Sequence, residues 1–123
     1  MIVTPVIVDE RGDVLFFESV ERAEGKLEAI DVRNEEYVAY DSEGRLLKLA
    51  IERSETSTFF GLGTNVLDYV VVEGAEDRPN HAPQLRAVLV RFFGRAGFQP
   101  TELSAIPLQD LVRRGVERSG FTI

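Results

Sequence analysis

The chain has 123 residues, no cysteine, one histidine (His81) and a formal net charge of −7. This composition excludes disulfides, thiolate nucleophiles, and metal sites built from thiolates or from several histidines of one chain. A chain of this length is most simply one domain spanning residues 1–123, and no apolar run approaches the roughly 20 residues that a membrane span needs. The N-terminus lacks the basic stretch of a signal peptide, so we expect a cytoplasmic protein.

The negative charge is concentrated in the first half of the chain. Residues 1–57 contain 14 acidic and 7 basic residues, whereas residues 58–123 contain 7 of each. Such a distribution repels nucleic acid and anionic membranes and attracts a basic protein. We therefore expect a basic protein as the partner, and neither nucleic acid nor a membrane.

Two hairpins are predicted near the N-terminus. Apolar segments at 2–8 and 14–17 flank the sequence DERG, which suits a type I turn in which Gly12 takes the positive φ that closes a bulged hairpin. The sequence DSEG at 41–44 has the same turn chemistry. It joins the strand that contains EYVAY to a strand in which apolar and polar residues alternate from Leu47 onwards.

A helix is predicted between the hairpins, over residues 20–30. Ser19 suits the N-cap position, and Glu21 favours the positive end of the helix. Gly25 weakens such a helix by about 1 kcal/mol relative to alanine, so packing must hold it. The apolar residues that recur at helical spacing are Val20, Ala23, Leu27 and Ile30.

The second half of the chain is expected to contain one more strand and two helices. The polar segment 54–65 predicts a loop, and LDYVVVE at 67–73 predicts a fifth strand in a central, well-covered position. Helices are predicted over 81–96, where the apolar stripe is strongest, and from Pro107 to Gly120. The order strand–strand–helix–strand–strand–strand–helix–helix predicts an α+β domain, an antiparallel sheet of about five strands with helices packed on one face.

Acidic residues form the main candidate site, a surface for a basic partner. In a helix over 20–30, four carboxylates would lie in one ridge opposite the apolar face: Glu21, Glu24, Glu28 and Asp31. Two more acids and three aromatic anchors would extend this surface: Glu35, Glu36, Tyr37, Tyr40 and Phe59. The alternative is an ordinary solvated helix face, although a purely solubilising surface usually mixes both signs of charge.

The other motifs do not indicate catalysis or a cofactor. FFGLGTN at 59–65 lacks the third glycine, the lysine and the following helix of a phosphate-binding loop. The sequence offers His81 neither an oriented carboxylate nor a pocket. The arginines of the last two helices fit solvated faces of an acidic protein better than a nucleic-acid site: Arg91, Arg95, Arg113, Arg114 and Arg118. We therefore expect no enzyme, no metal site and no cofactor.

Residues 13–49, together with HAPQLRAVLVRFFGRAG at 81–97, resemble small bacterial proteins that look like the immunity proteins of polymorphic or secreted toxins. The resemblance implies a small acidic α+β protein that neutralises a cognate toxin by binding at or near its active site. It transfers no functional residue to this chain. The alternative function is a small-molecule-binding or regulatory domain with a pocket between sheet and helices.

Overall fold

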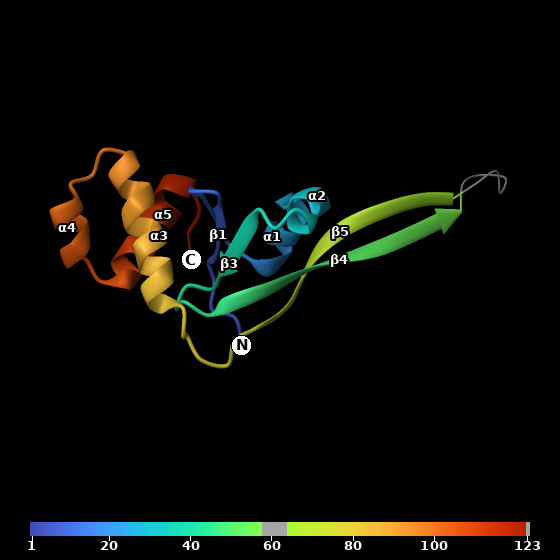
Figure 1. The fold of residues 1–123 in the computed structure, drawn as a ribbon, viewed down its shortest axis with the longest axis horizontal. Helices are drawn as coiled ribbons and strands as arrows, with labels where there is room; N and C mark the ends of the chain where they lie inside the picture. The colour runs from blue at the N-terminus through green and yellow to red at the C-terminus, as the bar shows by residue number, and fades with distance from the viewer. Residues whose placement is uncertain (58–63, 123) are drawn as a thin grey trace.

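The structure, a computed structural model, describes residues 1–57 and 64–122. These residues form an antiparallel sheet of five strands with helices, which confirms the predicted α+β fold (Figure 1). The strand order is β2-β1-β3-β4-β5. The strands are β1 (Val6–Glu10), β2 (Asp13–Phe17), β3 (Tyr37–Tyr40), β4 (Leu46–Ser57) and β5 (Thr64–Ala75). The helices are α1 (Val20–Lys26), α2 (Ala29–Arg33), α3 (Ala82–Arg95), α4 (Pro100–Ala105) and α5 (Leu108–Ser119).

The first turn confirms the predicted hairpin but not the predicted turn type. Glu10 lies directly opposite Asp13, so the connection has two residues and no bulge. Arg11 and Gly12 both have positive φ, 52° and 99°, which is the pattern of a type I′ turn. Such a turn follows the right-handed twist of the strands it joins, whereas a type I turn would splay them. Gly12 therefore has the backbone conformation expected of it.

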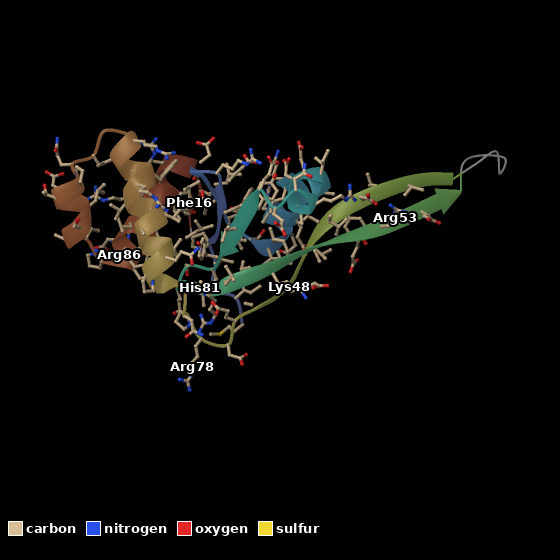
Figure 2. The ribbon with its side chains drawn as sticks, viewed as in Figure 1. Phe16, Lys48, Arg53, Arg78, His81 and Arg86 are labelled. Atoms are coloured by element: carbon tan, nitrogen blue, oxygen red, sulfur yellow. The ribbon has the colours of Figure 1, made fainter. Side chains whose placement is uncertain are left out.

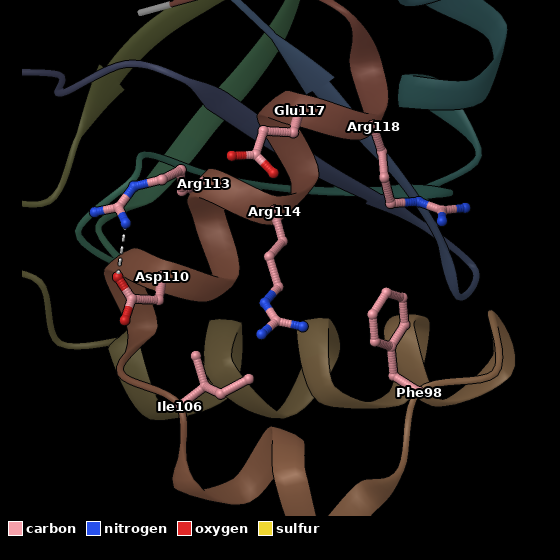
Figure 3. Close-up of a pocket in the computed structure, with 7 residues that line it drawn as sticks. All are labelled: Phe98, Ile106, Asp110, Arg113, Arg114, Glu117 and Arg118. Carbon is pink, nitrogen blue, oxygen red and sulfur yellow. Dashed lines mark ion pairs between the residues drawn. The ribbon is translucent and has the colours of Figure 1, made fainter.

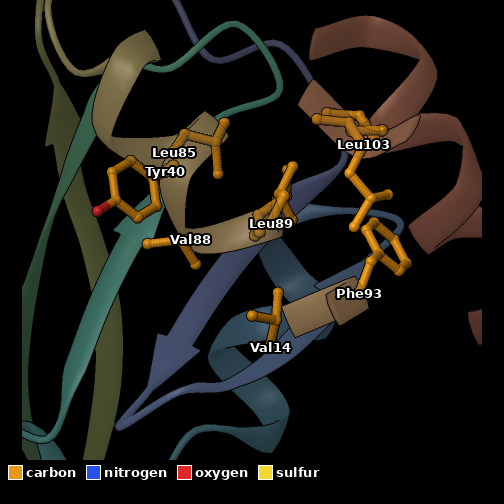
Figure 4. Packing of buried hydrophobic residues seen from close by; sticks show 10 residues of the cluster. Val14, Tyr40, Leu85, Val88, Leu89, Phe93 and Leu103 are labelled. Carbon is orange, nitrogen blue, oxygen red and sulfur yellow. The ribbon is translucent and has the colours of Figure 1, made fainter. Parts of the chain in front are cut away.

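Helices cover both faces of the sheet, so the prediction that they pack on one face is wrong. Neighbouring residues of β1 point to opposite faces, and they belong to two different core clusters. Ile7 belongs to the cluster that contains residues of α3 and α5. Figure 4 shows part of this cluster, around Tyr40 and Leu85. Val6 and Val8 pack with Ala23 and Leu27 of the first helical segment. Because β1 is covered on both sides, it is apolar at three successive positions.

The predicted helix over 20–30 is broken into α1 and α2. Ser19 accepts a hydrogen bond from the amide of Arg22 at 3.1 Å, which confirms the predicted N-cap. Leu27 has an extended backbone (φ −73°, ψ 144°), and this ends α1 while the leucine side chain stays in the core. The change of direction places α2 over β4 and β5, and it leaves Ile30 exposed rather than inward-facing.

The second half differs from prediction at the hairpin and agrees with it at two helices. β5 is an edge strand and not a central one. β4 continues to Ser57 and β5 begins at Thr64, so residues 54–57 and 64–65 of the predicted loop lie in strands. α3 and α5 lie where helices were predicted, and Gly120 ends α5 in the left-handed conformation (φ 83°). The short helix α4 between them was not predicted.

Candidate protein-binding surface

The β4–β5 hairpin forms an arm that extends away from the helices (Figure 1). Its two strands have 12 residues each, more than twice the length of β1 or β2. The base of the arm contacts α1 and α2, whereas α3 and α5 pack over β2 on the other side of the sheet. Further out, from Ser54 and Leu67 to Ser57 and Thr64, the two strands of the arm pair with each other.

Apolar side chains are exposed on the outer part of this arm. Val66 is 51% exposed and Leu67 is 65% exposed, and they point to opposite faces because they are adjacent in one strand. Tyr69, which shares a face with Leu67, is 39% exposed. Leu67 and Tyr69 thus lie on one face of the arm and Val66 on the other, so a partner that encloses the arm would cover all three side chains. The prediction of a central fifth strand missed this surface.

Ion pairs connect the middle of the arm to α2. Asp68 of β5 binds Arg53 of β4 at 3.0 Å and Arg33 of α2 at 2.9 Å. Hydrogen bonds from Arg53 and Arg33 lower the pKa of Asp68 below its usual value, so this carboxylate stays charged to a lower pH than a free aspartate does. Arg53 is labelled in Figure 2, midway along the arm. The pairs orient the arm relative to α2.

The predicted acidic ridge does not exist as one row, because the helix that would carry it is broken. Glu21 and Glu28 are exposed, but they lie on either side of the break at Leu27. Glu24 is half-buried, and its Oε2 accepts a hydrogen bond from the amide of Val72 at 2.9 Å. Glu24 thereby attaches α1 to the edge strand β5, a structural role that its spacing in the sequence did not indicate.

Asp31, Glu36 and Tyr37 form a hydrogen-bonded group where α2 meets β3. The Tyr37 hydroxyl donates to Asp31 Oδ2 at 3.0 Å and accepts from the Glu28 amide at 3.3 Å. A hydrogen bond to Asp31 raises the pKa of Glu36, burial raises it further, and Arg11 at 2.9 Å acts in the opposite direction. These side chains are therefore already engaged with one another. The neighbouring Glu35 is exposed, with a positive φ of 56°.

Two of the predicted aromatic anchors do not belong to the described surface. Tyr40 is 0% exposed and lies in the core cluster beneath α3, so the prediction that it is an exposed anchor is wrong. Tyr40 lies opposite Ile7 and therefore on a face of the sheet that helices cover. The alternation of residue types in so short a strand did not indicate which face is covered. Phe59 lies outside the described residues.

Charge is divided between the two ends of the molecule. Residues 1–81, which form the sheet, the arm, α1 and α2, contain 18 acidic and 8 basic residues. Residues 82–122, which form α3, α4 and α5, contain six arginines and three carboxylates. Arg86, at the helical end, and Arg53, on the arm, lie far apart in Figure 2. The acidic surface thus includes the arm, and the helical end is basic.

His81 has a carboxylate partner that the sequence did not indicate. Its Nδ1 lies 2.6 Å from Glu76 Oε1, and the same oxygen accepts a hydrogen bond from the Leu46 amide at 2.7 Å. The Leu46 amide is the main cause that lowers the pKa of Glu76, with His81 contributing. The His81 amide also donates to the carbonyl of Gly44, at the start of α3. These bonds join α3 to the β3–β4 turn. They give the side chains of His81 and Glu76 a structural role.

Two clefts lie beside α5. One, of about 620 Å³, is lined by side chains of α5 and of the segments on either side of α4 (Figure 3). The other, of about 430 Å³, lies between α5, the N-terminal residues and the β3–β4 turn. Within the described ranges, no group of three or more histidine or carboxylate side chains has an arrangement that suits a metal ion.

Comparison with protein-family models, curated proteins and solved structures finds no match for this chain. Of the helices in residues 1–57 and 64–122, none has both the length and the apolar character needed to cross a membrane.

Proposed function

We propose that this chain is a protein-binding module that uses the outer part of the β4–β5 arm and the acidic surface around it to bind a basic protein. The observation that carries the proposal is the exposure of Val66 and Leu67 on the outer part of the arm, where neither side chain belongs to a core cluster. Exposed apolar side chains contribute free energy of binding when a partner buries them. In this proposal the chain acts by binding and not by catalysis.

The charge of the surface supports a basic partner. The arm and the body around it belong to the part of the chain with 18 acidic and 8 basic residues. Exposed carboxylates at the rim of an interface speed up association with a basic protein and disfavour acidic competitors. Glu21, Glu28 and Glu35 are exposed and are suited to this role.

The resemblance to immunity proteins narrows the proposed partner to a cognate toxin. A toxin that acts on nucleic acid or on a phosphorylated cofactor has a basic cleft around its active site. An acidic protein with a projecting arm suits such a cleft in both charge and shape. We propose that the arm binds at or near that cleft and excludes the substrate.

The test uses the purified product of the neighbouring open reading frame as the binding partner. The double variant Val66→Ser/Leu67→Ser is expected to weaken binding by about tenfold or more, since fully burying a valine or leucine side chain is worth roughly 1.5–3 kcal/mol. The matched control is Leu15→Ser, which alters an exposed leucine (38%) on β2, at the opposite edge of the sheet. Equal affinities for the double variant and the control would contradict the proposal. Circular dichroism confirms that both variants are folded.

A second candidate function, binding of a small molecule, is favoured by the cleft of about 620 Å³. This volume falls within the range of small-molecule sites, which is roughly 300–1,000 Å³. The cleft lies among helices and not between sheet and helices as the sequence suggested.

A further inference from the structure

The larger cleft beside α5 combines arginine side chains with an apolar floor. It is bounded by α5 and by the two segments that flank α4, which contribute Phe98 and Ile106 (Figure 3). Both of these side chains are partly buried and pack against the core cluster beneath α3. The floor is therefore held in place by the core.

Arg114 lies at the centre of this cleft. Its guanidinium carbon is 5.6 Å from the centre of the Phe98 ring, within the range of a cation–π interaction. Figure 3 shows the guanidinium group between Phe98 and Ile106, with Arg118 on the far side of the phenyl ring. Arg114 is half-buried, so part of its hydration is already lost.

Three arginines and two carboxylates, Asp110 and Glu117, line the cleft, so its lining has a net positive charge. Arg113 binds Asp110 at 3.3 Å. Within residues 1–57 and 64–122, neither Arg114 nor Arg118 has a carboxylate oxygen within 4.0 Å. A partly desolvated guanidinium group is stabilised by a charge-assisted hydrogen bond to an anion, and none of the described residues supplies one to Arg114.

The surroundings of the cleft also favour an anion. α3, α4 and α5 contain six arginines and three carboxylates, so the local charge is positive although the whole chain is negative. We propose that this cleft binds a small organic anion, with its carboxylate or phosphate group at Arg114 and its apolar part on Phe98 and Ile106. This proposal is independent of the one made for the arm.

The test is calorimetric titration of the full chain at low ionic strength with phenyl phosphate and, separately, with benzoate. We expect at least one of them to bind saturably, with a dissociation constant below about 5 mM, and their relative affinities distinguish phosphate from carboxylate recognition. Inorganic phosphate and benzyl alcohol, which carry the charge or the ring alone, are expected to bind at least about fivefold more weakly, because each lacks one half of the interaction.

Two variants test the assigned residues. Arg114→Gln is expected to weaken binding of the preferred anion about tenfold, since it removes a charge-assisted hydrogen bond. The matched control is Arg91→Gln, an exposed arginine on α3 that does not line the cleft, and it is expected to leave the affinity within about twofold. Three results would overturn the proposal: no saturable binding of either anion up to about 20 mM, equal losses in the two variants, or inorganic phosphate binding as tightly as phenyl phosphate.

Discussion

Asp41 and Arg45 form an ion pair in the turn between β3 and β4, and both side chains are buried. Arg45 Nη1 lies 3.1 Å from Asp41 Oδ2. The Asp41 carboxylate also accepts the amides of Val3, Glu43 and Arg45 at 2.9–3.1 Å. One carboxylate thus holds together the turn, the N-terminal segment and the buried guanidinium group. Beside it, Gly44 has a φ of 98°, and a Cβ there would overlap the backbone of Ala82 in α3.

Replacing Asp41 with alanine should destabilise the fold strongly. The change leaves three amides without their acceptor and a buried guanidinium without its buried counter-ion, at a cost of about 3 kcal/mol or more. The matched control is Glu73→Ala, which breaks the exposed pair with Lys48 and should cost less than about 1 kcal/mol. Urea unfolding at neutral pH measures both free energies. Similar losses in the two variants would show that the buried pair is not a special source of stability.

Two helical glycines should respond in opposite directions to alanine. A Cβ on Gly115 of α5 would overlap the ring of Phe16, so Gly115→Ala is expected to cost about 1–3 kcal/mol as the ring is displaced. A Cβ on Gly94 of α3 would meet no neighbouring element of the described residues within 4 Å, so Gly94→Ala should stabilise the helix by up to about 1 kcal/mol. Thermal unfolding distinguishes them, and equal melting temperatures would argue against close packing of α5 on β2.

The fold should lose stability at alkaline pH through its tyrosines. Burial raises the pKa of Tyr37 from 10.0 to about 12, a hydrogen bond to Glu52 raises the pKa of Tyr69, and burial raises that of Tyr40. Because the folded chain holds the phenolic protons more tightly, this stabilisation is complete below pH 10 and is lost for Tyr37 as the pH rises towards about 12. Tyrosinate absorbance and circular dichroism, recorded together, measure it. A full ionisation step near pH 10 in the folded protein would contradict the expectation, and Tyr37→Phe should remove the step near 12.

The acidic residues of α1 and α2 should separate into two groups. Glu21→Gln/Glu28→Gln should leave the free energy of unfolding nearly unchanged, because both carboxylates are exposed. With a basic partner, the same change should slow association at low salt and flatten its salt dependence, since rim charges act mainly on the on-rate. Stopped-flow association at two ionic strengths measures this. Unchanged rates would mean that these carboxylates belong to a solvated face.

Glu24→Ala is the contrasting variant for that experiment. It leaves the Val72 amide without its acceptor and should lower the free energy of unfolding by about 1 kcal/mol. If Glu24→Ala were as stable as the wild type, the attachment of α1 to β5 would contribute nothing measurable.

Local chemistry made part of this fold predictable. Ser19 as a cap and glycines 12, 44 and 120 in positive-φ positions follow from steric and hydrogen-bonding rules that act within a few residues. Tertiary contacts decided the rest. The valine run of β5 suggested strands on both sides, but Val70 is buried by the cluster around α1, while β5 has one strand neighbour. The break at Leu27 likewise depends on where the core lies. The spacing of apolar residues within one segment carries no information about the position of the core.

The candidate surface was predictable in charge and not in shape. The excess of acids in the first half is a property of composition, so it could be read directly from the sequence. The arm could not, because the polar residues of the outer part of β4 have the composition of a loop, and only their pairing with β5 makes them a strand. Leu67 therefore became a candidate only once its strand was seen to project.

The separation of charge along the molecule gives it a permanent electric dipole. α3, α4 and α5 lie at one end of the longest axis and the arm extends towards the other, as Figure 1 shows. The field of a basic protein exerts a torque on such a dipole and turns the arm towards the partner before contact. In such an encounter the arginine cleft lies at the end of the molecule that points away from the partner, and it faces solvent. A bound partner and a bound anion would then occupy the same molecule at once, without competing for space.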